Sequence, residues 1–157
     1  MSTIIVPQKI LEEIAAEGER ESKRNKEIRG ILLGRHKLED DSIEIYERIS
    51  LLPKKAGRGY NFYEKFYDGL KNWYASIKFV RFTKKLEKRN ENLGFAVYNT
   101  RPLFDLAHPN LLKRFCKDYE RDFSILIRGI TMLYTVDTKQ FEAMNEDEEP
   151  VKIEPKL

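Results

Sequence analysis

The sequence has few of the features that mark secreted, membrane-spanning or phosphate-loop proteins. Cys116 is its only cysteine, so the chain cannot form an internal disulfide, which fits a reducing compartment. The apolar run at residues 4–6 is too short for a signal-peptide core, and no segment approaches the ~18 apolar residues of a membrane span. Gly57 and Gly59 lie in too short a loop, without the lysine of a phosphate-binding loop. We therefore expect a soluble, cytoplasmic protein that does not contact the membrane.

Length and charge point to one domain with a highly charged surface. A chain of 157 residues with 41% hydrophobic residues can close one hydrophobic core, which excludes a fully disordered protein. Charged residues make up 35%, above the usual quarter, and such surfaces are common in thermophile proteins. The composition therefore favours a single domain from a thermophilic source.

Hydrophobic periodicity predicts an α/β fold with a mixed central sheet flanked by helices. In the second strand of the expected hairpin, residues 42–52, Ile43 and Ile45 lie on one face, and Ile49 and Leu51 follow after a break in the pattern. The expected order is a strand at 3–6, a helix that begins at Pro7, a hairpin over 28–52, a helix from Asn61, a strand at 93–99, a helix at 110–121, and strands at 123–127 and 130–136.

The helix that begins near Asn61 changes character along its length. Apolar residues at four- and three-residue steps predict a buried face, made of Phe62, Phe66, Leu70, Tyr74 and Ile77. Cations then crowd the sequence, with Phe79, Phe82 and Leu86 as candidate buried points. Such a cationic face can bind phosphates or an acidic protein. The candidate residues for an anionic partner are Lys78, Arg81, Lys84, Lys85, Lys88 and Arg89.

Two segments about sixty residues apart carry the most informative patterns. In the first, Glu27, Gly30, Leu32 and Gly34 give the pattern Glu-x-x-Gly-x-Leu-x-Gly. The second, residues 93–102, is an apolar strand that ends in Asn-Thr-Arg-Pro.

Together these segments resemble the MPN (JAB/JAMM) family over roughly residues 3–137. The resemblance implies an α/β fold whose active members are zinc isopeptidases that remove ubiquitin-like tags. Their second segment carries two zinc-binding histidines, and here Asn99 and Arg101 stand in those places. The general base is kept as Glu27, but no carboxylate follows Asn110 where the third ligand would stand. Zinc requires imidazole or carboxylate ligands and a permanent cation repels it. The resemblance therefore implies a degenerate member that binds no metal or other cofactor and has no catalytic residues.

The leading hypothesis is a catalytically inactive scaffold or protein-interaction module. It would pair with another MPN-like domain, as a homodimer or heterodimer, or with a ubiquitin-like partner. In the emptied pocket, Arg101 would neutralise Glu27. One alternative is a nucleic-acid-binding accessory protein that uses the basic segment 78–89. Another is a hydrolase with a rearranged metal site built from Glu27, Asp105 and His108.

Domain organisation completes the expectations. Residues 1–141 should form the MPN-like domain, and residues 142–157 an acidic, flexible tail. The tail would then be able to fold back on the basic segment and compete with anionic ligands. His36 is expected at an exposed strand end, and Cys116 as a small packed residue on a helix.

Overall fold

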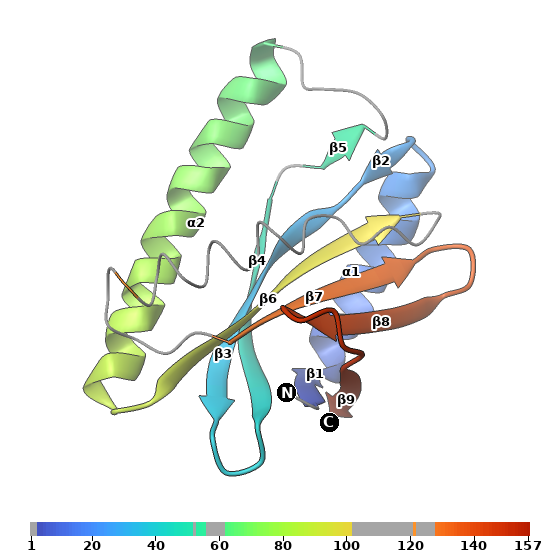
Figure 1. Ribbon diagram of the computed structural model, residues 1–157. Helices are drawn as coiled ribbons and strands as arrows, with labels where there is room; N and C mark the ends of the chain where they lie inside the picture. Colours follow the sequence, from blue (N-terminus) through green and yellow to red (C-terminus); the bar gives the residue numbers. More distant parts are fainter. Residues whose placement is uncertain (1–2, 52, 56–61, 102–120, 122–127) are drawn as a thin grey trace.

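A computed structural model describes residues 3–51, 53–55, 62–101, 121 and 128–157. In this part of the chain, seven strands form one mixed sheet that curls until it is nearly barrel-shaped (Figure 1). The predicted α/β class with a mixed sheet is thereby confirmed. The strand order is β8-β7-β6-β3-β4-β1-β9. The strands are β1 (Thr3–Pro7), β3 (Arg29–Lys37), β4 (Ser42–Ser50), β6 (Asn92–Arg101), β7 (Arg128–Thr135), β8 (Gln140–Asn145) and β9 (Lys152–Lys156).

Two helices and a small two-stranded sheet complete the described structure. The helices are α1 (Gln8–Ser22) and α2 (Phe62–Lys88), and the small sheet pairs β2 (Lys26–Glu27) with β5 (Lys54–Lys55). Within the large sheet, β3 runs antiparallel to both β4 and β6, whereas β1 is parallel to β4 and β9 and β6 is parallel to β7. The helix predicted at 110–121 and the strand predicted at 123–127 lie almost wholly outside the described residues.

A β-bulge interrupts the pairing of β4 with β3. The register with β3 shifts between Leu33 and Gly34, so that Tyr46 becomes the extra residue of β4. Gly34 is required here, because a Cβ at this position would overlap the backbone carbonyl of Glu44. The bulge turns Ile45 to one face of the sheet and Ile49 to the other, and each enters a different core cluster.

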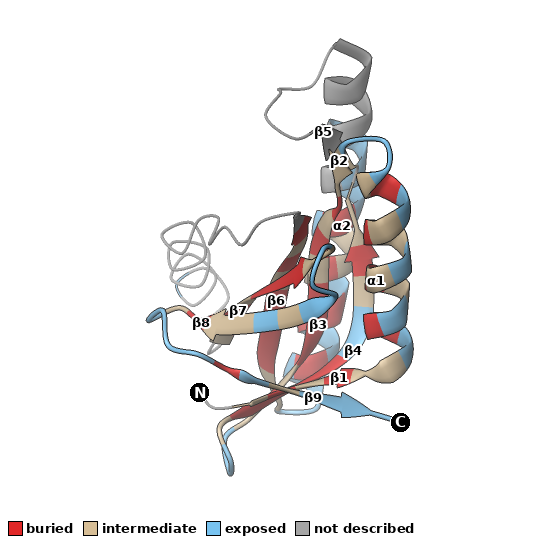
Figure 2. Cartoon of the chain, turned by 90° about the vertical axis from the view of Figure 1, so that its right-hand side faces the viewer, coloured by how far each residue is buried: buried red, intermediate tan, exposed pale blue. Residues whose placement is uncertain are grey.

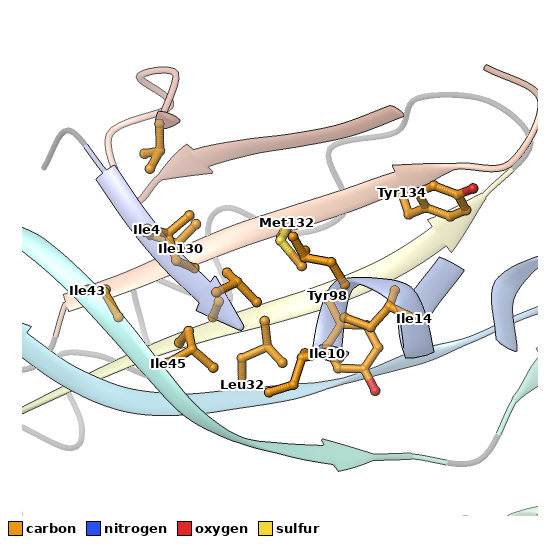
Figure 3. Packing of buried hydrophobic residues seen from close by; sticks show 14 of the residues in the cluster. Ile4, Ile10, Ile14, Leu32, Ile43, Ile45, Tyr98, Ile130, Met132 and Tyr134 are labelled. Carbon is orange, nitrogen blue, oxygen red and sulfur yellow. The ribbon is translucent and has the colours of Figure 1, made fainter. Parts of the chain in front are cut away.

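Each face of the sheet has its own hydrophobic core. On one face, Ile10, Leu11 and Ile14 of α1 pack against strand residues (Figure 3). Figure 2 shows buried residues along the side of α1 that faces the strands. On the other face, α2 packs through Ala75, Phe79, Phe82 and Leu86, against residues that include Leu33, Leu93 and Phe95. The expected buried points Phe79, Phe82 and Leu86 are thus confirmed.

The C-terminal acidic segment belongs to the sheet, so the predicted flexible tail at 142–157 is wrong. The boundary expected after residue 141 falls inside β8, and β9 pairs with β1. Between these strands, Oδ1 of Asn145 accepts hydrogen bonds from the backbone N–H groups of Asp147 and Glu149, at 2.9 and 3.0 Å. Val151 is buried in the core beside α1. The many acidic residues obscured a short alternation of apolar residues, and these apolar residues pack residues 141–153 onto the sheet.

This arrangement also bears on the predicted competition between the tail and the basic segment. The acidic residues from 142 to 149 are held in β8 and in the turn that follows it. Glu146, for example, pairs with Arg128 of β7 at 3.2 Å. The segment is not a free arm, and an internal competitor of the predicted kind is therefore not supported.

Candidate functional site

Thr100 anchors the end of β6 where the Asn-Thr-Arg motif lies. Its Oγ1 accepts a hydrogen bond from the backbone N–H of Ile28 at 3.0 Å, and its own N–H donates to the carbonyl of Ile28 at 3.0 Å. The side chain is buried against Gly18 of α1, where an added Cβ would lie 2.8 Å from Cγ2 of Thr100. Side chains alternate between the two faces of a strand, so Asn99 lies on the face opposite to Thr100, where it is half-buried.

The strand register brings the two motif segments together. Arg29 of β3 pairs with Asn99 of β6. Continuing that register by two residues places Glu27 opposite position 101, the last residue of β6. Glu27 itself also pairs with Lys54 in the small β2–β5 sheet. The two motifs that were sixty residues apart therefore meet at one end of the sheet, with backbone positions 27 and 101 facing each other.

The remaining predicted site residues fall outside the described part of the chain. Asn110, Asp105, His108 and Cys116 lie there, as does the side chain of Arg101, so the ion pair between Arg101 and Glu27 stays a prediction. Within the described residues, no group of three or more His, Cys, Asp and Glu side chains is placed to hold a metal ion.

His36, expected to be exposed, is buried, and that expectation is wrong. It lies near the end of β3, where its Nε2 is 2.7 Å from Oδ1 of Asp41. Its partner, Asp41, is the last residue of the turn that joins β3 to β4. The contact stabilises this turn, because it links Asp41, the residue before β4, to β3.

A partly buried polar network lies between α1 and the sheet, and no sequence pattern predicted it. Arg48 of β4 donates hydrogen bonds to Glu17 at 2.9 Å and to the Tyr98 hydroxyl at 3.1 Å. Its Nε lies 3.5 Å from Glu13. Burial raises the pKa of Tyr98 above its usual range, so this hydroxyl stays protonated. The members come from distant parts of the chain, so only strand register reveals them.

The network explains the first glycine of the Glu-x-x-Gly pattern. A Cβ at Gly30 would overlap the Tyr98 hydroxyl and the carbonyl oxygen of Ile49. Glycine at this position therefore makes room for the tyrosine that Arg48 binds. Gly30 thus serves packing and hydrogen bonding between the sheet and α1.

Helix α2 turns an unexpected face to solvent. Leu70 and Tyr74, predicted to be buried, are 48% and 55% exposed, and Trp73 is 66% exposed. The prediction failed because α2 carries two apolar stripes that lie on opposite sides. The inner stripe, at residues 75, 79, 82 and 86, packs on the sheet.

We call the second stripe the outer seam. Its residues are spaced alternately four and three positions apart along α2. This heptad spacing, two residues in every seven, keeps them on one side of the helix. Its first half is apolar and its second half is cationic, and its cations are exposed. Nζ of Lys78, beside the seam, lies 5.1 Å from the centre of the Tyr74 ring. The outer seam consists of Leu70, Tyr74, Ile77, Arg81, Lys84 and Lys88.

The other predicted cations border the outer seam. Lys85 and Arg89 are exposed, and Lys78 is half-buried. All six residues predicted to bind an anionic partner thus lie on the solvent side of α2 or just past its end. Trp73 borders the apolar half of the outer seam.

No protein-family model matches the chain, and no curated protein matches it. The solution structure of protein DSY2949 from Desulfitobacterium hafniense is similar, with a TM-score of 0.49 and 14% identity over 99% of this chain and 95% of that chain. A similarity of this size carries no argument about function. Within the described residues, no helix is both long enough and apolar enough to cross a bilayer.

Proposed function

We propose that this protein is a non-catalytic, MPN-like protein-interaction module. The observation that carries the proposal is the outer seam of α2 with its neighbour Trp73. Folded monomers seldom leave large apolar side chains gathered on one surface, and such surfaces mark interaction sites. Leu70, Trp73 and Tyr74 lie within two turns of one helix and are each about half exposed or more.

The residue types favour a protein as the partner. Tryptophan, tyrosine and arginine are the residues most enriched among those that dominate binding energy at protein interfaces. All three types occur here, as Trp73, Tyr74 and Arg81. Leu70 and Ile77 add aliphatic surface, for which a protein core provides a better match than a phosphate backbone does.

The proposal that the chain is non-catalytic rests on the motif residues. Asn99 and Arg101 occupy the positions at which the MPN resemblance implies zinc-binding histidines. The register brings position 101 opposite Glu27, so a permanent cation would belong to the same strand end as the retained carboxylate. That combination suits charge neutralisation and opposes zinc binding.

The exposed cations of α2 support a second candidate function, nucleic-acid binding. Arg81, Lys84, Lys85 and Lys88 face solvent together, as a phosphate-binding surface requires. Binding to duplex DNA or RNA would weaken steeply as salt rises. A protein partner held by the apolar half of the outer seam would stay bound through the same salt range.

Two measurements test the leading proposal. The first is elemental analysis of protein purified without chelator, for which we expect no stoichiometric zinc. Near-stoichiometric zinc that is lost in Glu27→Gln would restore the hydrolase alternative. The second measures retention of a co-purifying protein through high-salt washes, and we expect Leu70→Ser/Tyr74→Ser to abolish it. Leu38→Ser is the control, because Leu38 is also exposed but lies in the turn between β3 and β4.

A further inference from the structure

The outer seam has the geometry by which one α-helix packs along another. Its residues recur every 3.5 positions on average, which is the spacing of helix-to-helix contact in coiled coils. From Leu70 to Lys88 the seam spans 18 residues, or about 27 Å along the helix axis. The inner stripe, on the opposite side of α2, packs on the sheet from Ala75 to Leu86, so the sheet supports the part of α2 that carries the cationic half of the outer seam.

The two halves of the outer seam specify different chemistry in a partner. Leu70, Tyr74 and Ile77 require apolar side chains opposite them. Arg81, Lys84 and Lys88 require carboxylates, since cations directly opposite them would repel. One helix with apolar residues along one half of a face and acidic residues along the other half satisfies both requirements.

A second copy of the outer seam is a poor partner. Parallel pairing would bring the cations at 81, 84 and 88 of two copies together. Antiparallel pairing in full overlap would place each cationic half against the other copy's apolar half, where its charges lose water and gain no carboxylate. Charge complementarity therefore selects a different, acidic helix.

We propose that the outer seam of α2 binds an acidic amphipathic α-helix of a partner protein. This inference rests on the proposed function, for which it names the surface and the class of partner. Trp73 lies beside the apolar half of the seam and is the only tryptophan in the chain. Binding will bury it and shift its fluorescence emission to shorter wavelength, which provides a signal from the proposed surface alone.

The probe is a fluorescein-labelled helical peptide of about three heptads, with leucine in one half of its seam and glutamate in the other. Both chain orders are made, because helices can pack parallel or antiparallel. A peptide with lysine in place of glutamate is the charge control. We expect one glutamate peptide to raise its anisotropy on binding and to shift the emission of Trp73, measured with an unlabelled copy.

Charge reversal on the protein tests the location. We expect Arg81→Glu/Lys84→Glu/Lys88→Glu to weaken binding of the glutamate peptide by about tenfold or more, since three ion pairs are lost. The same variant should instead bind the lysine peptide, which shows that it is folded. The matched control reverses one arginine and two lysines elsewhere on the exposed surface, Lys9→Glu/Arg24→Glu/Lys152→Glu, and should change affinity less than about twofold.

Four results would overturn the inference. The first is that neither glutamate peptide binds, and the second is that both triple variants weaken binding equally. The third is that an oligonucleotide binds more tightly and displaces the peptide. The fourth is a stable homodimer that dissociates in the variant at 81, 84 and 88. Its failure is separable from that of the proposed function. Stoichiometric zinc with intact peptide binding would remove the non-catalytic assignment only, whereas a zinc-free protein that retains a partner independently of α2 would remove this inference only.

Discussion

Replacing one residue on each side of α2 will separate the inner stripe from the outer seam. Phe79 is 2% exposed and packs edge-on against Phe95, with ring centres 6.0 Å apart. Its replacement by alanine leaves a cavity in the core under α2, and such changes cost about 3–5 kcal/mol. For a chain of this size that corresponds to a fall in Tm of roughly 10 °C.

Trp73→Ala on the outer side should behave differently. Trp73 is 66% exposed, so the folded protein loses little packing. Alanine also has the higher helix propensity, by about 0.5 kcal/mol, which offsets the small loss of contact. The free energy of unfolding should therefore change by less than about 0.5 kcal/mol.

The assay is urea unfolding followed by circular dichroism, with thermal unfolding as a second readout. Both variants and the parent protein are compared at the same protein concentration, because self-association would alter the midpoints. A loss of more than about 2 kcal/mol in Trp73→Ala would refute the reasoning. It would mean that the outer side of α2 packs within the protein and is not free to bind a partner.

Three further predictions test the rest of the fold. Gly34→Ala should lower the free energy of unfolding by about 2 kcal/mol or more, because the new Cβ would overlap the Glu44 carbonyl. Gly69→Ala has open space around it and should raise the free energy of unfolding by up to about 1 kcal/mol in the same assay. Arg48→Ala should lower the free energy of unfolding by about 1–2 kcal/mol in urea, because the partly buried Glu17 carboxylate loses its charged donor while the Tyr98 hydroxyl keeps its contact with Ser50; a cost near zero would show that the network adds nothing. Hydrogen bonding from Lys37 at 2.7 Å lowers the pKa of Glu44 below its ordinary 4.5. The contribution of this contact to the free energy of unfolding is therefore present above pH 4.5 and is lost as the pH falls through the lower pKa of the folded state. The urea midpoint of Glu44→Gln should consequently fall less on acidification than that of the parent, and equal slopes would contradict this origin.

Residue patterns predicted the main strands because those strands are long and apolar. The bulge between Ile45 and Ile49 could not be found from spacing, because residues four apart fall on one face of a regular strand and the bulge sends these two to opposite faces. The same reasoning failed for α2. Leu70 and Tyr74 have the spacing of a buried stripe, but so do Phe79 and Phe82, and spacing alone does not say which stripe meets the sheet.

Composition misled at the C-terminus, where acidic residues outnumber apolar ones. Val151 and the neighbouring short strands are stabilised by pairing with β7 and β1, which are distant in sequence. The partly buried network around Arg48 could not be predicted from the sequence for a related reason. Glu17, Arg48 and Tyr98 come from three separate elements, and only the sheet register brings them together. The alignment of Glu27 with position 101 follows from that register as well.

Zinc affinity tests the central proposal, that the strand end at positions 27, 99 and 101 holds no zinc and that the protein acts by binding a partner. Zinc would be titrated by calorimetry into the parent protein and into Asn99→His/Arg101→His, which places imidazoles at the strand end opposite Glu27. We predict no saturable binding by the parent and measurable binding by the double variant, because a cation is removed and two ligands are added. Saturable binding of one zinc ion per chain by the parent, abolished in Glu27→Gln, would contradict the account.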